Sequence, residues 1–298
     1  MWRADPGRIA SAVSARFGVA FAGAPRPPAA GYPGVELRPL DVHGNEGFSI
    51  VLEVAWRSIE LSFRPGPFAG PLIGQMGGAG PEARLAFRRL ADDIRSRGGV
   101  VTLVVNGDVQ TAGDDASWPE TWRQLDLRVR RSPAVVNTED HPDNDAEVEA
   151  WAVRFTGLLL SLVPVERLDD AATSVPEGLP EGASVRVEVN RYERSRTNRA
   201  NCLALHGCQC KACDLDLGDK YGPAGEGFIH VHHVVPVSKL GAGYIVDPLT
   251  DLVPLCPNCH GIAHRTDPPA SVAAIRAMLA AAAATSGNTV RTGQAGKG

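Results

Sequence analysis

Two Cys-x2-Cys pairs, Cys210–Cys213 and Cys256–Cys259, constrain the fold of this chain more than any other feature. A spacing of two residues lets both thiolates of a pair bind one ion from a tight turn, and two such pairs complete a tetrahedral site. All six cysteines lie between Cys202 and Cys259. Because the N-terminal residues lack the pattern of a signal peptide, cysteines gathered in this way indicate a metal site rather than disulfides.

The two pairs predict a structural zinc, because four cysteine ligands leave no coordination position for a substrate. Such an ion would supply much of the folding free energy of a small domain. Cys208 is an alternative to Cys210 as a ligand. Cys202 is expected to be a small buried residue on a helix.

Six of the eight histidines fall in the same part of the chain, between residues 206 and 264. A predicted strand with alternating faces carries His230 and His232 on one side and His233 on the other. His260 and His264 are spaced i, i+4 on a predicted helix, so they can hold one ion. For His230 we favour a surface hydrogen bond over a role as an extra ligand or a DNA contact.

Together these patterns resemble the HNH endonucleases. The order is Cys-x2-Cys, then His-His-x2-Pro, then Asp-Leu-Val, then Cys-Pro-x-Cys-His-x3-His. The phrase GEGFIHVHHVVP…DLVPLCPNCHGIAHR is similar over its whole length to the branch of McrA-like restriction enzymes that also carries a four-cysteine zinc. The resemblance covers about residues 186–267 and does not extend into residues 1–165. It implies a ββα-metal fold, in which two strands and a helix hold one divalent ion.

The resemblance also implies a role for each residue by position. His233 resembles the general base that activates water, and His232 resembles a metal ligand. His260 and His264 occupy the positions of the helix ligands, and His260 is counted with the catalytic residues as well. Asp251 stands where the family has its central Asn, which orients the general base.

Asp251 is a departure from the family pattern. Its carboxylate can accept the imidazole proton as an Asn carbonyl does, but its negative charge would raise the basicity of His233. Asn258, inside the second cysteine pair, is the second candidate for this role. A neutral imidazole, with an ordinary pKa of about 6.5, can take a proton from water near neutral pH. The catalytic ion is expected to be Mg²⁺, Mn²⁺, Ni²⁺, Co²⁺ or Zn²⁺, and imidazole ligands favour the last four.

Length and composition suggest a globular chain of two domains. It has 298 residues, of which 44% are hydrophobic and 21% are charged, and domains average roughly 150 residues. The sequence contains no run of about 18 apolar residues, so no membrane span is predicted, and we expect a cytoplasmic protein. The fold class is predicted to be α+β. The parts are an N-terminal α+β recognition domain (1–165), a linker (166–184), the HNH ββα-metal nuclease domain (185–268), and an Ala-rich helix with a disordered tail (269–298).

Hydrophobic periodicity and turn residues predict the elements of the first domain. They are a short N-terminal helix, a loop over 24–34, strands over 47–56 and 58–64, a loop over 65–80, a helix over 81–99, strands over 99–107 and 124–131, and a long helix over 143–166.

Two groups of residues are candidates for contact with nucleic acid. The net charge of −4 argues against a chain that is basic throughout, but residues 186–211 are locally basic. Arg191, Arg194, Arg196 and Arg199 lie on or beside the predicted helix near 190–206 and are expected to contact DNA phosphates, with a solvated face as the alternative. The second group is aromatic. For stacking on a flipped base the candidates are Trp56, Trp118, Trp122 and Trp151, with core packing favoured for each.

The sequence therefore predicts a metal-dependent HNH endonuclease that hydrolyses phosphodiester bonds in double-stranded DNA. The resemblance implies restriction of modified DNA, with target choice in the first domain. A homodimer is expected, because cutting both strands generally needs two active sites. The alternatives are a zinc-dependent nucleic-acid-binding regulator that does not cleave, and a nuclease specific for RNA or for a nucleic-acid structure.

Overall fold

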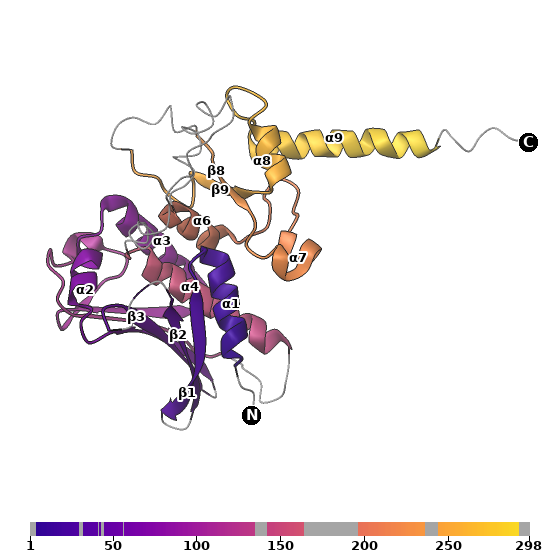
Figure 1. Cartoon of the computed structure of the whole chain (residues 1–298). Helices are drawn as coiled ribbons and strands as arrows, with labels where there is room; N and C mark the ends of the chain where they lie inside the picture. Colours follow the sequence, from indigo (N-terminus) through magenta and orange to yellow (C-terminus); the bar gives the residue numbers. More distant parts are fainter. Residues whose placement is uncertain are drawn as a thin grey trace, which may run out of the picture.

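A computed structural model shows an antiparallel sheet with helices packed on it, followed by a small second unit (Figure 1). The structure describes residues 4–29, 32–40, 42, 45–55, 57–134, 142–163, 196–235 and 244–291. Within these ranges the chain is a mixture of helix and sheet, so the predicted α+β class is confirmed. The predicted linker over 166–184 lies outside the described residues.

Seven strands of the described ranges form the larger sheet, in the order β1-β2-β3-β4-β7-β5-β6. All neighbouring strands pair antiparallel. The strands are β1 (Phe21–Ala29), β2 (Tyr32–Pro39), β3 (Phe48–Ala55), β4 (Ser58–Pro65), β5 (Gly99–Val105), β6 (Asp108–Gln110) and β7 (Leu125–Arg131).

Local sequence explains most of this sheet. The β3–β4 hairpin pairs Ala55 with Ser58, which confirms the predicted join. Asn106 and Gly107 both have positive φ between β5 and β6, as a tight two-residue hairpin turn requires. The alternation in β7 places its leucines and Val129 inside and Arg128 and Arg130 outside. The predicted strands are therefore confirmed to within two residues.

Three helices lie together on one face of the sheet (Figure 1). They are α1 (Pro6–Phe17), α3 (Pro81–Ser96) and α4 (Pro142–Leu160). The N-cap Asp5 accepts hydrogen bonds from the first free N–H groups of α1, and Gly18 ends that helix in the left-handed region, where glycine is favoured. The apolar side of α3, including Phe87 and Leu90, is buried in the main core.

Two predictions for the first domain are wrong. The expected loop over 24–34 belongs largely to β1 and β2. Because β1 is the edge strand, prolines are tolerated there, and the register with β2 shifts between Arg26 and Ala29, where two of them lie. The expected loop over 65–80 contains α2 (Gly70–Gly77). Packing overrides the weak helix propensity of glycine here, since Ile73 and Met76 are buried and a Cβ at Gly77 would collide with the ring of Trp122.

The second unit is built on the two-stranded sheet β8–β9, and α8 packs against both strands. Its core is small and includes four of the six cysteines. The elements are α6 (Arg196–His206), α7 (Leu217–Tyr221), β8 (His230–His233), β9 (Leu252–Leu255), α8 (Pro257–Ala263) and α9 (Val272–Arg291).

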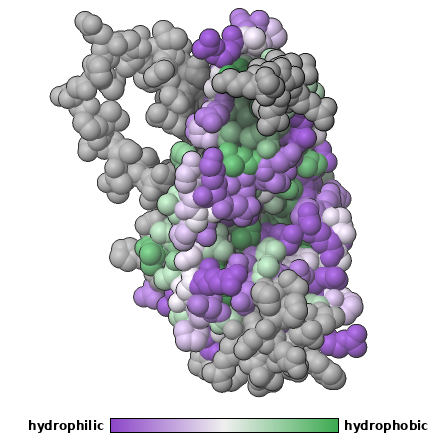
Figure 2. Space-filling view, turned by 90° about the vertical axis from the view of Figure 1, so that its right-hand side faces the viewer, coloured by the Kyte–Doolittle hydropathy of each residue, from purple (hydrophilic) through white to green (hydrophobic). Residues whose placement is uncertain are grey.

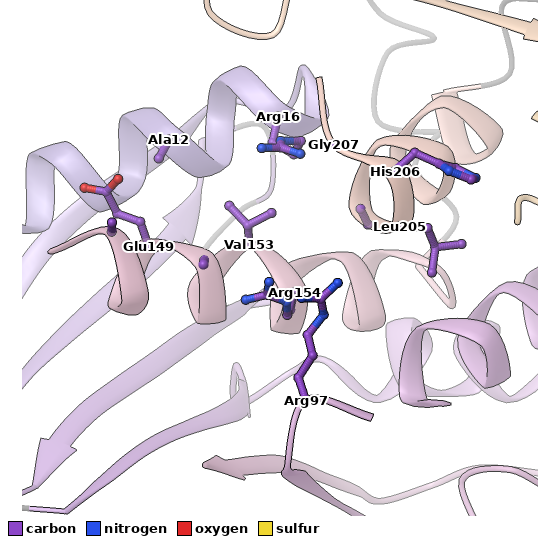
Figure 3. A pocket seen from close by; sticks show the side chains of 12 residues that line it. Ala12, Arg16, Arg97, Glu149, Val153, Arg154, Leu205, His206 and Gly207 are labelled. Atoms are coloured by element: carbon purple, nitrogen blue, oxygen red, sulfur yellow. The ribbon is translucent and has the colours of Figure 1, made fainter. Parts of the chain in front are cut away.

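Helix α6 joins the two cores. Ala200 is buried with the first core, whereas Cys202 and Leu203 are buried with the second. Helices α1, α3 and α4 contact α6, and Arg16 at the end of α1 donates to the carbonyl of Leu203 at 3.0 Å. A cavity of about 440 Å³ lies at this junction, and Figure 3 shows Arg16, Arg154 and His206 around it. The two units therefore share a packed boundary.

The C-terminal helix α9 projects from the body (Figure 1). Ile275 is buried near its start, while Met278 and Leu279 are exposed. The face in Figure 2 carries hydrophilic side chains interspersed with hydrophobic ones. None of the helices in the described ranges has the length and apolar character needed to span a membrane.

Candidate metal centres and active site

The two cysteine pairs converge on one point. Cys210 and Cys213 lie in the loop after α6, whereas Cys256 is the N-cap of α8 and Cys259 lies in its first turn. All four sulfurs lie within 4.8 Å of one another. A tetrahedral zinc with Zn–S bonds of about 2.3 Å needs sulfurs about 3.8 Å apart, and the Sγ atoms of Cys213 and Cys256 are 3.7 Å apart. The cluster fits one tetrahedral ion.

Backbone amides favour the thiolate form of Cys210 in this cluster. Burial alone would raise the pKa of Cys210, but N–H groups from both cysteine pairs outweigh it and lower that pKa to about 7. Burial and the neighbouring sulfurs raise the pKa of Cys213 and of Cys259. Neighbouring thiolates repel one another electrostatically, and a bound cation relieves this repulsion. The environment therefore suits a metal ion.

The remaining two cysteines have a different environment. Burial raises the pKa of Cys202 to about 12 and also raises that of Cys208. Neither belongs to the four-sulfur group. Cys202 is buried on α6, as its sequence context predicts. The structure therefore favours Cys210 over Cys208 as the fourth ligand.

A second group of ligand atoms joins β8 to α8. His232, on β8, lies with His260 and His264 so that one ring nitrogen of each is within 4.8 Å of the others. His232 is only 5% exposed, His260 is half-buried, and His264 is exposed at the end of α8. The three imidazoles thus reach from the interior to the surface. A catalytic metal site keeps an open position of this kind for substrate, whereas a closed four-cysteine site does not.

His230 lies beside this group. Its Nδ1 is 3.2 Å from Nδ1 of His260, and the two rings meet edge to face. An outer hydrogen-bond partner of this kind fixes the ring orientation of a metal-binding histidine. His230 is exposed, and this contact agrees with the surface hydrogen bond expected for it. Strand alternation places it on the same face as His232.

His233 lies on the opposite side of β8 and is 8% exposed. It pairs in register with Leu252, the neighbour of Asp251. The N–H of Val234 donates to the Asp251 carbonyl at 2.8 Å. The strand pairing therefore brings the backbones of the expected general base and of its expected orienting residue to adjacent positions.

The Asp251 carboxylate is held by its own turn. Its Oδ2 accepts hydrogen bonds from the Tyr244 hydroxyl at 2.9 Å and the Asp247 amide at 2.8 Å. Its Oδ1 accepts from the Thr250 hydroxyl at 3.2 Å. The hydrogen bond to Asp251 raises the pKa of Tyr244, so this hydroxyl stays a donor. Asn258, the second candidate, is exposed and lines a separate hollow.

The expected DNA-contacting arginines are only partly within the described residues. Arg191 and Arg194 lie outside them, as does the side chain of Arg196. Arg199 is half-buried, and its guanidinium donates to the carbonyls of Gly227, at 2.8 Å, and Ile229. These bonds tie α6 to the segment that leads into β8, which is a structural use of Arg199.

The tryptophans belong to the core. Trp118, Trp122 and Trp151 are all buried, and Trp118 packs edge to face on Trp122 with centroids 5.6 Å apart. The indole N–H groups of Trp118 and Trp122 donate to backbone carbonyls. Core packing, the favoured alternative, is what the structure shows for these three. Trp56 lies outside the described residues.

Comparisons with known proteins agree with this geometry. Residues 210–266 match the family model described as HNH endonuclease. A segment of 89 residues is 36% identical to the Type IV methyl-directed restriction enzyme EcoKMcrA of Escherichia coli (strain K12), and covers 28% of this chain and 30% of that enzyme. The match therefore spans less than a third of the relative. No solved structure matches the chain.

The resemblance expected from the sequence is thus confirmed. The chain carries an HNH endonuclease domain at residues 210–266, with a four-cysteine knuckle clustered for zinc binding.

Proposed function

We propose that this protein is a metal-dependent endonuclease that hydrolyses phosphodiester bonds in DNA. The observation that carries the proposal is the convergence of His232, His260 and His264 on one point, with His233 on the adjoining strand position. This group lies inside the HNH domain. A purely structural site would not need a histidine beside the strand ligand.

In the proposed mechanism, His233 acts as the general base. A neutral imidazole takes a proton from the attacking water, and the Asp251 carboxylate orients the ring and stabilises its protonated form. His232, His260 and His264 hold the divalent ion, which supplies Lewis-acid stabilisation of the phosphoryl group when bound. The outer partner His230 keeps His260 in its ligating orientation.

The two metal sites are proposed to hold different ions. Four thiolates in a closed cluster favour a structural Zn²⁺. Three imidazoles accept Mn²⁺, Ni²⁺, Co²⁺ or Zn²⁺ more readily than Mg²⁺. The exposed His264 marks the side from which the DNA phosphate would approach. Arg265, the exposed next residue, is a candidate phosphate contact together with Arg191, Arg194 and Arg196.

We further propose that the protein restricts modified DNA as a cytoplasmic homodimer. The relative's name describes a methyl-directed enzyme, and the sheet unit outside the HNH domain is available for target recognition. Two active sites would cut both strands, and α9, with Met278 and Leu279 exposed, is the candidate dimer contact. A binding panel of unmodified, methylated and phosphorothioate duplexes tests recognition, using the full chain with His233→Ala. Uniform affinity across the panel would remove the modification-reading role.

The activity is tested with supercoiled plasmid and the wild-type chain. Plasmids with and without methylation are incubated with Mg²⁺, Mn²⁺, Ni²⁺, Co²⁺ or Zn²⁺, with a chelator as the control. We expect nicked and linear products that depend on the metal. Binding without cleavage under every condition would support the regulator instead, and cleavage of RNA alone would support the RNA-specific nuclease.

A further inference from the structure

One ion pair links the first unit to the turn that holds Asp251. Arg89, on α3, donates from Nε and Nη2 to a single carboxylate oxygen of Asp247, at 3.1 and 2.6 Å. The two residues are 158 positions apart in the sequence. The Asp247 side chain is 14% exposed, so this pair is better shielded from water than an ordinary surface ion pair.

Asp247 is in turn hydrogen-bonded to Asp251. Its backbone N–H donates to Oδ2 of Asp251 at 2.8 Å, and its carbonyl accepts from the Asp251 N–H at 2.9 Å. Its second carboxylate oxygen accepts from the N–H of Leu249 at 3.0 Å. Asp247 therefore contacts Arg89 with one oxygen and shapes the turn with its other polar atoms.

The same turn is held from a second direction. The Nε2 atom of His206, at the end of α6, is 3.2 Å from the carbonyl of Pro248. Both α3 and α6 belong to the packed boundary between the two units. A turn fixed at adjacent residues by two helices has little freedom to move Asp251 relative to His233.

We propose that Arg89 is a positioning residue of the nuclease, which fixes the Asp251 carboxylate through Asp247. The inference rests on the proposed roles of Asp251 and His233. It assigns part of the catalytic geometry to the unit that lies outside the HNH domain. A displacement of well under an ångström at a general base or its partner reduces the rate, and about 1 Å costs about 100-fold.

The test compares Arg89→Gln with Arg88→Gln. Arg88 is a matched control, because it lies on the same helix, is 36% exposed against 38% for Arg89, and pairs at 2.6 Å with Asp115 of its own unit. For Arg89→Gln we expect kcat to fall about 10-fold or more, with unchanged KM and unchanged affinity for Mn²⁺. Arg88→Gln should behave as wild type. Arg89→Lys should recover part of the rate, since one charged donor remains.

Asp247→Asn completes a double-mutant cycle. If Arg89 acts through Asp247, the double variant should be no slower than the slower single variant. Additive losses, or equal rates for Arg89→Gln and Arg88→Gln, would overturn the proposal. So would a loss in Arg89→Gln that a lower folded fraction or weaker Mn²⁺ binding fully explains.

Hydrogen exchange separates this proposal from the proposed activity. Amides over residues 247–251 should exchange faster in Arg89→Gln than in wild type or Arg88→Gln, whether or not the protein cleaves DNA. An unchanged exchange rate in this segment would by itself refute the positioning role. Faster exchange in a protein that cleaves nothing would uphold the contact and reject the nuclease assignment.

Discussion

Removal of one thiolate from the cysteine cluster should release its metal and loosen the HNH domain. Cys213→Ser is the most informative change, because Cys213 is only partly buried and the substitution disturbs packing little. Its sulfur lies 3.7 Å from that of Cys256, so Cys213 is a direct neighbour of the second cysteine pair. Structural zinc sites contribute about 10–16 kcal/mol. An equal share for each of four ligands is then about 2.5–4 kcal/mol, or a loss of about 10²- to 10³-fold in zinc affinity.

The assay is a competition between the protein and a zinc chelator, with thermal unfolding measured on the same samples. Cys208→Ser is the control, because Cys208 is also partly buried and lies near the knuckle but outside the four-sulfur group. The control should keep wild-type zinc affinity. Because three of the four clustered cysteines belong to the small core beneath β8 and β9, Cys213→Ser should also lower the melting temperature.

Equal zinc affinity in the two variants would refute this reasoning. The same conclusion would follow if Cys208→Ser lost zinc and Cys213→Ser kept it, since Cys208 would then be the ligand. A loss of zinc with no change in thermal unfolding would show that the ion binds but does not stabilise the fold.

Three further changes test separate parts of the structure. His230→Ala should weaken binding of Mn²⁺ to the histidine site about 10- to 100-fold by freeing the His260 ring, and calorimetry that finds wild-type affinity would exclude the orienting role. Burial lowers the pKa of His206, so the unfolded chain takes up its proton at a higher pH and stability falls as pH drops below about 6.5. His206→Gln, which keeps a donor for Pro248, should make melting temperatures between pH 7 and pH 5 less pH-dependent, and an unchanged slope would contradict this. Trp122→Ala should cost about 3–5 kcal/mol in urea unfolding without changing the relative affinity for methylated and unmethylated DNA. A selective change in that relative affinity would support a role of Trp122 in recognition.

Local patterns in the sequence predicted which cysteines and histidines cluster, because the members of each pair sit at a fixed offset on one element. Two-residue spacing placed the cysteines in knuckle turns, and i, i+4 spacing placed His260 and His264 on one face of α8. Alternation likewise predicted β7, and runs of apolar residues predicted β3 and β4. The family resemblance supplied the roles of the histidines, which spacing alone does not distinguish.

Features that depend on tertiary contact were not visible. Helix α2 forms where Gly77 admits the Trp122 ring, and composition alone indicates a loop there. Arg199 was expected to contact DNA phosphates, but its partners are backbone carbonyls 28 and 30 residues away. The Arg89–Asp247 pair joins two units that the sequence treats as independent. The periodicity of residue types along the sequence does not reveal contacts between residues so far apart.

In the proposed mechanism, His233 removes a proton from water while the neighbouring histidines hold the ion. The decisive experiment measures nicking of supercoiled plasmid at saturating Mn²⁺ by His233→Ala beside wild type. We predict a rate about 10²- to 10⁴-fold lower than that of wild type, with equal Mn²⁺ affinity and equal melting temperature. Nicking at the wild-type rate by His233→Ala would contradict the assignment.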